Sequence, residues 1–255
     1  MKNFKLRKGF LYAVVFIWIL IQLSFTFSDS NGIGITNINF SKYEAHTNRN
    51  NYLHESPSKL NMLYNELHLS EKGLTESSFK MALKGFHILK RKGLITNDRM
   101  ITIIDFTQPS YKKRMFVLDL QTGKLLFNNY VAHGQNTGAA YANRFSNKPE
   151  SLQSSLGFYT TSKTYNGKNG FSMQLKGLEP GINDLAEQRA IVMHGAPYVS
   201  ESFIRAKGYI GRSHGCPAVP SQMNKLIIEN IKNGSLLFIY SNDKKYLQQS
   251  QLLAP

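Results

Sequence analysis

The stretch IVMHGAPYVSESFIRAKGYIGRSHGCPAVP, residues 191–220, contains the only cysteine of this 255-residue chain. His214 lies two residues before Cys216, and His194 stands near the start of the stretch. Ser-His-Gly before the cysteine and proline after it are typical of a tight polar turn, whereas an inert cysteine usually lies in an apolar core. This composition indicates a reactive thiol.

A nucleophilic thiol needs a base, a group that orients the base, and N–H donors for the oxyanion. The backbone N–H groups of Gly215 and Cys216 are the natural donors, with that of His214 as a third, because glycine lets the chain bend. His194 follows the apolar run 191–193, so we expect it to be the base, held at the end of a strand. We also expect it to lower the pKa of the Cys216 thiol from its free value of about 8.5.

Spacing alone leaves two other interpretations open. A structural histidine at the end of a strand would explain His194 equally well. A tetrahedral zinc site is the other, with four candidate ligands: His133, His194, His214 and Cys216. No pair of these residues stands at the spacing of a zinc finger, so we expect no metal, and nothing in the sequence indicates a cofactor.

The N-terminus has the pattern of an export segment. Four basic residues within the first eight precede an almost wholly apolar run at 10–27. We interpret residues 1–28 as a signal peptide or an N-terminal membrane anchor, since about 18 apolar residues is borderline for spanning a bilayer. The protein is therefore expected to be exported to the periplasm or cell envelope. A lone cysteine in an exported chain cannot form an internal disulfide.

The charge of the chain limits its partners. Lysine and arginine number 31 against 16 acidic residues, a formal net charge of +15. Such an excess favours polyanions, of which anionic envelope polymers or a membrane surface suit an exported protein and nucleic acid does not. A basic surface without a specific partner explains the charge as well.

Hydrophobic periodicity divides the rest of the chain. Residues 29–57 are polar and rich in asparagine, which is typical of a linker. Helical spacing runs through 58–97, with Thr75 as a candidate N-cap for the second of two helices. Residues 98–242 predict a mostly β domain of the sandwich or barrel type with a few flanking helices, and 243–255 a polar tail.

Seven strands and one helix are expected in this domain. The strands are β-branched or aromatic runs between turn residues: 100–106, 114–120, 124–132, 156–165, 171–178, 189–194 and 235–240. An amphipathic helix is expected at 221–232, and the loop 133–151 is too long to be a simple connection.

The residues around Cys216 also carry a resemblance. His-Gly at 194–195 followed by GRSHGCPAV at 211–219 is similar to the signature of YkuD-type L,D-transpeptidases, and more closely to the murein L,D-transpeptidase catalytic-domain family. Further stretches fit this family: IIDFTQPS at 103–110, VLDL at 117–120, VAHG at 131–134, FSN at 145–147, SSLGFY at 154–159 and 177–200. The resemblance covers roughly residues 75–240 and implies a YkuD-like fold for the domain.

The resemblance assigns roles to individual residues. Cys216 matches the nucleophile and His194 the general base, which the backbone carbonyl of Gly195 orients. Gly215 and Cys216 match the oxyanion donors, within a loop that includes Ser213 and His214. Better-known members carry an arginine two residues after the cysteine, where this chain has Ala218. Two residues are candidates for holding the substrate instead: Arg212, for its carboxylate, and Tyr198.

The implied chemistry is acyl transfer between peptidoglycan stem peptides through a Cys216 thioester, which forms 3–3 cross-links. Water as the acceptor would make the same site an L,D-carboxypeptidase, and a protein acceptor would attach an outer-membrane protein to the wall. Endopeptidases of the papain or NlpC type place cysteine before histidine, the reverse of the order here. A non-catalytic module that binds the wall through its basic surface is the remaining alternative.

Overall fold

A computed structural model describes residues 57–254, with side chains from residue 62 onward. The predicted export segment and all but the last residue of the predicted linker lie outside the described residues. No helix within the described part combines the length and the apolar character that crossing a membrane requires.

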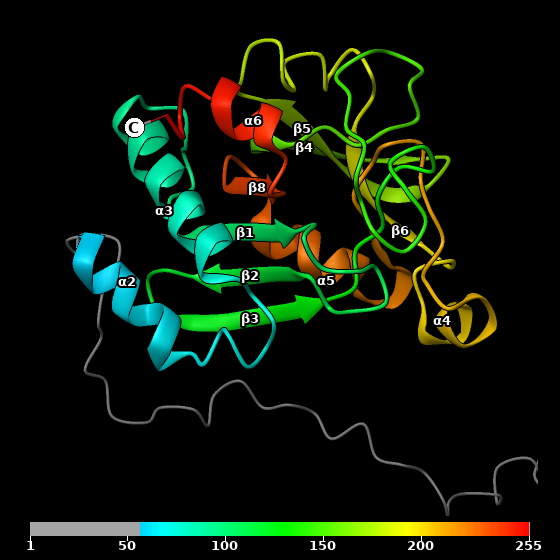
Figure 1. Cartoon of the computed structure of the whole chain (residues 1–255), viewed down its shortest axis with the longest axis horizontal. Coiled ribbons are helices and arrows are strands. Elements are labelled where there is room, and N and C mark those ends of the chain that lie inside the picture. The colour runs from blue at the N-terminus through cyan, green and yellow to red at the C-terminus, as the bar shows by residue number, and fades with distance from the viewer. Residues whose placement is uncertain (1–56, 255) are drawn as a thin grey trace, which may run out of the picture. The chain divides into compact units, whose positions relative to one another are not determined.

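Two helices precede the sheet, as the periodicity predicted. They are α2 (Pro57–Glu66) and α3 (Glu76–Arg91), which lie together at one end of the molecule in Figure 1. The hydroxyl of Thr75 caps α3 by accepting from the N–H of Ser78 at 3.3 Å and donates to Asp105 on the first strand. This shared carboxylate fixes α3 against the sheet, in addition to the apolar face that the helix buries.

Eight strands form a single sheet in the order β3-β2-β1-β8-β4-β5-β6-β7. Their bounds are β1 (Met100–Asp105), β2 (Met115–Asp119), β3 (Lys124–Asn129), β4 (Gly157–Gly167), β5 (Gly170–Gly177), β6 (Val192–Ala196), β7 (Ala218–Pro220) and β8 (Leu236–Tyr240). Neighbours are antiparallel except β1 with β8 and β6 with β7. The chain after β3 pairs with the far edge of the sheet, Ala132 with Ala218, so the sheet nearly closes into a barrel.

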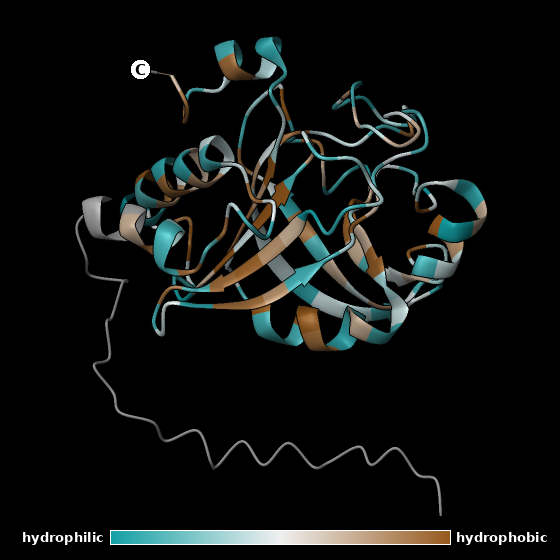
Figure 2. Ribbon diagram, turned by 60° about the horizontal axis from the view of Figure 1, so that its bottom comes forward, coloured by the Kyte–Doolittle hydropathy of each residue, from teal (hydrophilic) through white to brown (hydrophobic). Residues whose placement is uncertain are grey.

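The core lies between the sheet and its helices. Every residue of β1, β2 and β8 is buried, and the ribbon in Figure 2 has hydrophobic, brown stretches along the strands. The rings of Phe158 on β4 and Phe238 on β8 stack with centroids 4.1 Å apart. Gly85 brings α3 directly onto Phe158, because a Cβ at this position would lie 2.2 Å from the ring. A well-packed core of this kind supports the polar site at the other end of the sheet.

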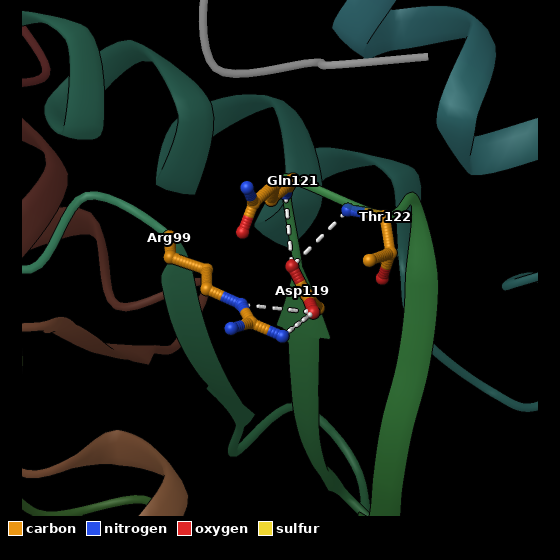
Figure 3. Close-up of polar contacts among 4 residues, drawn as sticks. All are labelled: Arg99, Asp119, Gln121 and Thr122. Atoms are coloured by element: carbon orange, nitrogen blue, oxygen red, sulfur yellow. Dashed lines mark hydrogen bonds and ion pairs between the residues drawn. The ribbon is translucent and has the colours of Figure 1, made fainter. Parts of the chain in front are cut away.

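A buried carboxylate turns the chain between β2 and β3 (Figure 3). Asp119 accepts from the backbone N–H groups of Gln121 and Thr122 at 2.9 and 3.2 Å and from Arg99 at 2.7 Å. Burial acts to raise the pKa of Asp119, but these hydrogen bonds outweigh it and the pKa is lowered. The carboxylate therefore stays charged and keeps the hairpin in register.

The structure adds elements that the sequence did not predict. They are α4 (Glu201–Lys207), β7 and α6 (Lys244–Gln249); the predicted helix α5 spans Ser221–Ile231. Residues 243–255, expected to be a polar tail, include α6, whose Tyr246 is buried and donates to the buried carboxylate of Glu179 at 3.2 Å. Strand β6 continues past His194 to Ala196, so this histidine lies inside the strand rather than at its end.

Candidate active site

The Ser-His-Gly-Cys segment is a turn that Ser213 holds from within. The Ser213 hydroxyl donates to the carbonyl of Cys216 at 2.6 Å and accepts from the N–H of Gly215 at 3.0 Å. Gly215 has φ +128°, and a Cβ there would lie 2.8 Å from the carbonyl oxygen of Gln153. Glycine is therefore required at this position, as much for lack of space as for backbone conformation. Since Gly215 donates to Ser213, the backbone N–H of Cys216 is the better oxyanion donor of the two.

Strand β6 and the residues before it surround the thiol. The N–H of Val192 donates to Sγ of Cys216 at 3.5 Å, and Sγ donates to the carbonyl of Ala190 at 3.7 Å. Ala190 has φ +52°, an uncommon conformation for a residue with a side chain, and it turns the chain into β6. The half-buried sulfur thus lies against the start of this strand, two residues before His194.

His194 has one ring nitrogen engaged by the backbone. It is buried on β6 and paired in register with Ala218 on β7, two residues after Cys216. Nδ1 lies 3.0 Å from the carbonyl oxygen of Gly195. Because a carbonyl can only accept, Nδ1 carries the proton and Nε2 keeps its lone pair. This is the tautomer of a general base whose orientation the following carbonyl fixes.

The resting thiol and imidazole are both neutral. Burial raises the pKa of Cys216, and the N–H of Val192, the charge of Arg189 and the N–H of Cys216 itself only partly offset it. Burial also lowers the pKa of His194. Contrary to the expectation from sequence, His194 is not among the groups that lower the pKa of the thiol. These two directions favour a neutral thiol beside a neutral imidazole over a preformed ion pair.

Arg189 was missed by the sequence analysis. Its guanidinium donates to the carbonyls of Ser146 and Gln153 and to the hydroxyl of Ser155, and its charge acts on Cys216. It therefore fastens the loop 146–155 beside the thiol and supplies a cation there. Backbone carbonyls as partners leave no pattern in the sequence, so no signal pointed to this residue.

His133 is not available as a metal ligand. Its Nδ1 accepts from Nη2 of the buried Arg114 at 2.7 Å, and its Nε2 lies 3.2 Å from the carbonyl oxygen of Gly138. Both ring nitrogens are thus used, and the zinc set considered from the sequence loses this member. Among residues 62–254, no group of three or more His, Cys, Asp or Glu side chains is placed to hold a metal ion.

The three other candidate residues, Arg212, Tyr198 and His214, have different surroundings. The exposed Arg212 donates through Nη1 to the carbonyls of Gln135 and Gly138 at 3.1 and 3.0 Å. One amino group of Arg212 therefore holds the loop that contains these two carbonyls. Tyr198 is half-buried, and burial, with a smaller contribution from Cys216, raises its pKa to about 12. The His214 side chain is exposed on the turn.

Two open hollows lie near the segment 211–216, although neither is lined by Cys216 or His194. The larger, about 520 Å³, lies between the loop 143–156 and α6 and includes Gln153, whose carbonyl faces Gly215. The smaller, about 260 Å³, lies beside α4 and includes Gly211 and Arg212. Both are large enough for part of a peptide substrate.

A comparison with known families finds one match, which covers most of the described chain. Residues 70–240 match the YkuD-type family described as L,D-transpeptidase catalytic domain, over more than half of the chain. No curated protein matches the chain.

Solved structures that are similar to this chain have low sequence identity to it. An L,D-transpeptidase from Mycobacterium smegmatis is 12% identical with a TM-score of 0.36, over 56% of this chain and 59% of that one. The helical cell shape determining protein Pgp2 from Campylobacter jejuni is 15% identical with a TM-score of 0.40, over 66% of this chain and 59% of that one. The match thus spans about three fifths of each of these proteins.

Proposed function

Because the chain belongs to the L,D-transpeptidase catalytic domain family, we propose that it is an acyltransferase of the cell envelope that uses Cys216 as nucleophile on peptidoglycan stem peptides. The observation that carries the proposal is the placement of Sγ against β6, two residues from a buried imidazole whose Nδ1 is tied to Gly195. A thiol and a base oriented by a carbonyl are the parts that acyl transfer through a thioester requires.

The first half-reaction forms the thioester. Nε2 of His194 takes the thiol proton as Sγ attacks the carbonyl carbon between the diamino acid at position three and D-alanine at position four. The backbone N–H of Cys216 stabilises the oxyanion, since this donor lies beside its own sulfur. The C–N bond then breaks, and His194 returns the proton to the amine of the departing D-alanine.

The second half-reaction resolves the thioester. The side-chain amine of a second stem attacks the acyl carbon, His194 takes its proton, and Cys216 leaves as the thiolate and is reprotonated. The product is a 3–3 cross-link.

The experiment that tests this function follows a disaccharide tetrapeptide with the full chain. We expect loss of D-alanine and a dimer of one tetrapeptide and one tripeptide, both identified by mass. Cys216→Ala is the matched control and should give neither product with an unchanged thermal midpoint, because one half-buried thiol contributes little to packing.

Each outcome of this experiment has a meaning. Tripeptide without dimer would replace the cross-linking activity by a carboxypeptidase with water as acceptor. Unchanged substrate with a folded wild-type protein, or turnover by Cys216→Ala, would contradict the proposal.

A further inference from the structure

Ser154 bridges two backbone groups next to the candidate nucleophile. It is buried, with 1% of its surface exposed. Its hydroxyl accepts from the N–H of Gly134 at 3.1 Å and donates to the carbonyl of Gly215 at 3.1 Å. Because Gly134 supplies the donor on one side, the hydroxyl hydrogen is left for the Gly215 oxygen.

The carbonyl that Ser154 holds belongs to the peptide unit that also contains the N–H of Cys216. In a planar trans peptide the C=O and the N–H point in opposite directions. Fixing the Gly215 oxygen towards Ser154 therefore directs the Cys216 N–H away from it. The N–H of Gly215 is already used by Ser213 at 3.0 Å. The orientation of this one peptide unit thus decides whether an oxyanion donor faces the sulfur.

We propose that Ser154 is a positioning residue that orients the Gly215–Cys216 peptide so that its N–H can stabilise an oxyanion at Cys216. The proposal deepens the proposed function, since an oxyanion forms only in acyl transfer. Ser154 touches no substrate and acts through the backbone of the turn.

The surroundings of Ser154 give it the rigidity that this role requires. Its own N–H donates to Oγ1 of the buried Thr137 at 2.8 Å, and its carbonyl accepts from the N–H of Ser146 at 3.0 Å. Arg189 clamps the same loop through the carbonyls of Ser146 and Gln153. The hydroxyl is therefore held on both sides before a substrate arrives, as electrostatic preorganisation demands.

Two reactions of the same thiol separate this role from a merely structural one. With p-nitrophenyl acetate, Sγ attacks the carbonyl carbon, an oxyanion forms, and the C–O bond breaks to give the thioacetate and p-nitrophenolate, while the thiol proton passes through His194 to solvent. With iodoacetamide, Sγ displaces iodide from a saturated carbon, and no oxyanion forms. Only the first reaction needs the Cys216 N–H. Cys216→Ala gives the background for both.

We expect Ser154→Ala to slow acylation of Cys216 by about 10- to 100-fold, since removing an oxyanion donor outright costs about 10²- to 10³-fold. Both rates are compared above the pH midpoint of alkylation of each protein, where the thiol is ionised and the influence of the Cys216 N–H on its pKa no longer matters. Alkylation should then stay within about twofold of the wild type. Ser154→Thr retains the hydroxyl and should restore most of the acylation rate. Ser235→Ala is the matched control: this buried hydroxyl just before β8 donates to the carbonyl of Ile231, so its loss should leave the ratio of the two rates unchanged.

Equal effects on both reactions, or none, would overturn the inference. If Ser154→Ala does not fold, Thr137→Val takes its place. This substitution removes the hydroxyl that accepts from the Ser154 N–H and changes the side-chain volume very little. It should then show the same selective loss of acylation at about 3- to 10-fold, and an unchanged ratio would overturn the inference. Because p-nitrophenyl acetate is not a wall substrate, a selective loss in a protein that leaves muropeptides unchanged would contradict the proposed function alone.

Discussion

Two buried histidines, His133 and His194, lie on neighbouring segments of the barrel and have different surroundings. His133 is fully buried, packs edge-on against Phe106, and has hydrogen-bond partners at both ring nitrogens. Within residues 62–254, His194 has a hydrogen-bond partner only at Nδ1. Burial lowers the pKa of both, that of His133 to about 3, so both are neutral at pH 7. Burial therefore does not distinguish a structural histidine from a general base. The difference is whether one ring nitrogen lacks a hydrogen-bond partner and can accept a proton.

The partner of His133 explains why its nitrogens are occupied. The guanidinium of Arg114 is completely buried and stacks on Phe106, 4.6 Å from the ring centroid. Burial lowers its pKa to about 9, although the charge of Asp105 acts in the opposite direction. Its N–H groups are satisfied by the carbonyls of Gln108 and Val131 and by His133. His133 therefore stabilises the folded state by accepting a hydrogen bond from the buried cation of Arg114.

The largest expected effect concerns His194. We expect His194→Ala to lower kcat for muropeptides by about 10²- to 10⁴-fold, since positioned acid–base catalysis contributes that much. In the wild type, the acid limb of the pH profile should fall below the 6.5 of a free histidine, because burial lowers the pKa and the base stays unprotonated to lower pH.

The same variant tests whether the pair is neutral at rest. The pH midpoint of iodoacetamide alkylation at Cys216 should hardly move in His194→Ala, because the histidine does not set the pKa of the thiol. A midpoint that rises clearly would indicate a thiolate–imidazolium pair and remove this part of the comparison.

His133 should show the opposite behaviour. His133→Ala leaves one N–H of the buried Arg114 without an acceptor, which costs about 1.5–3 kcal/mol for a hydrogen bond to a charged group. We expect a lower free energy of unfolding in denaturant titrations and a kcat per folded molecule close to that of the wild type. A stable His133→Ala protein with a lost kcat would place this histidine in the catalytic machinery instead.

The elements that could be predicted from the sequence are those that depend on residues close together in the chain. The strand predicted at 100–106 and the cap at Thr75 have local signals, and the structure contains both, with the strand ending at Asp105. Strand β7 has three residues and ends in proline, so only its pairing with β6 makes it a strand. Helix α4 buries no residue and therefore lacks periodicity, although Ser200 caps it and Gly208 ends it at φ +80°.

The remaining site residues act across long sequence distances. Ser154 reaches Gly215 over 61 residues, and Arg189 reaches the carbonyl of Gln153 over 36. Both contacts are to backbone oxygens. Every residue has such an oxygen, so the residue type of the acceptor gives no signal in the sequence. A single sequence pointed to Cys216 and His194 as the candidate nucleophile and base, but not to the groups that hold them in place.

The next effect is electrostatic and concerns the cation beside the thiol. The charge of Arg189 acts to lower the pKa of Cys216, against the larger effect of burial. Arg189→Gln removes the charge, so the pH midpoint of alkylation should rise and the rate at pH 7 should fall, because fewer thiols are ionised. Arg189→Lys keeps the charge and is the matched control, with a midpoint near that of the wild type. Identical midpoints in all three proteins would show that Arg189 acts only by fastening the loop 146–155.

The smallest effect is expected for the histidine nearest to the nucleophile in sequence. The His214 side chain is exposed, and within residues 62–254 no hydrogen bond to its ring is found, so it shares neither the tied nitrogens of His133 nor the oriented ring of His194. What His214 adds to the turn is its backbone, which alanine also provides. We expect His214→Ala to change kcat by less than about threefold and to leave the alkylation midpoint unchanged, since exposed substitutions seldom exceed about 0.5 kcal/mol. The measurement is muropeptide turnover beside His194→Ala under the same conditions. A loss as large as that of His194→Ala would mean that the ring of His214 turns inward when substrate binds, and the base would have to be assigned again.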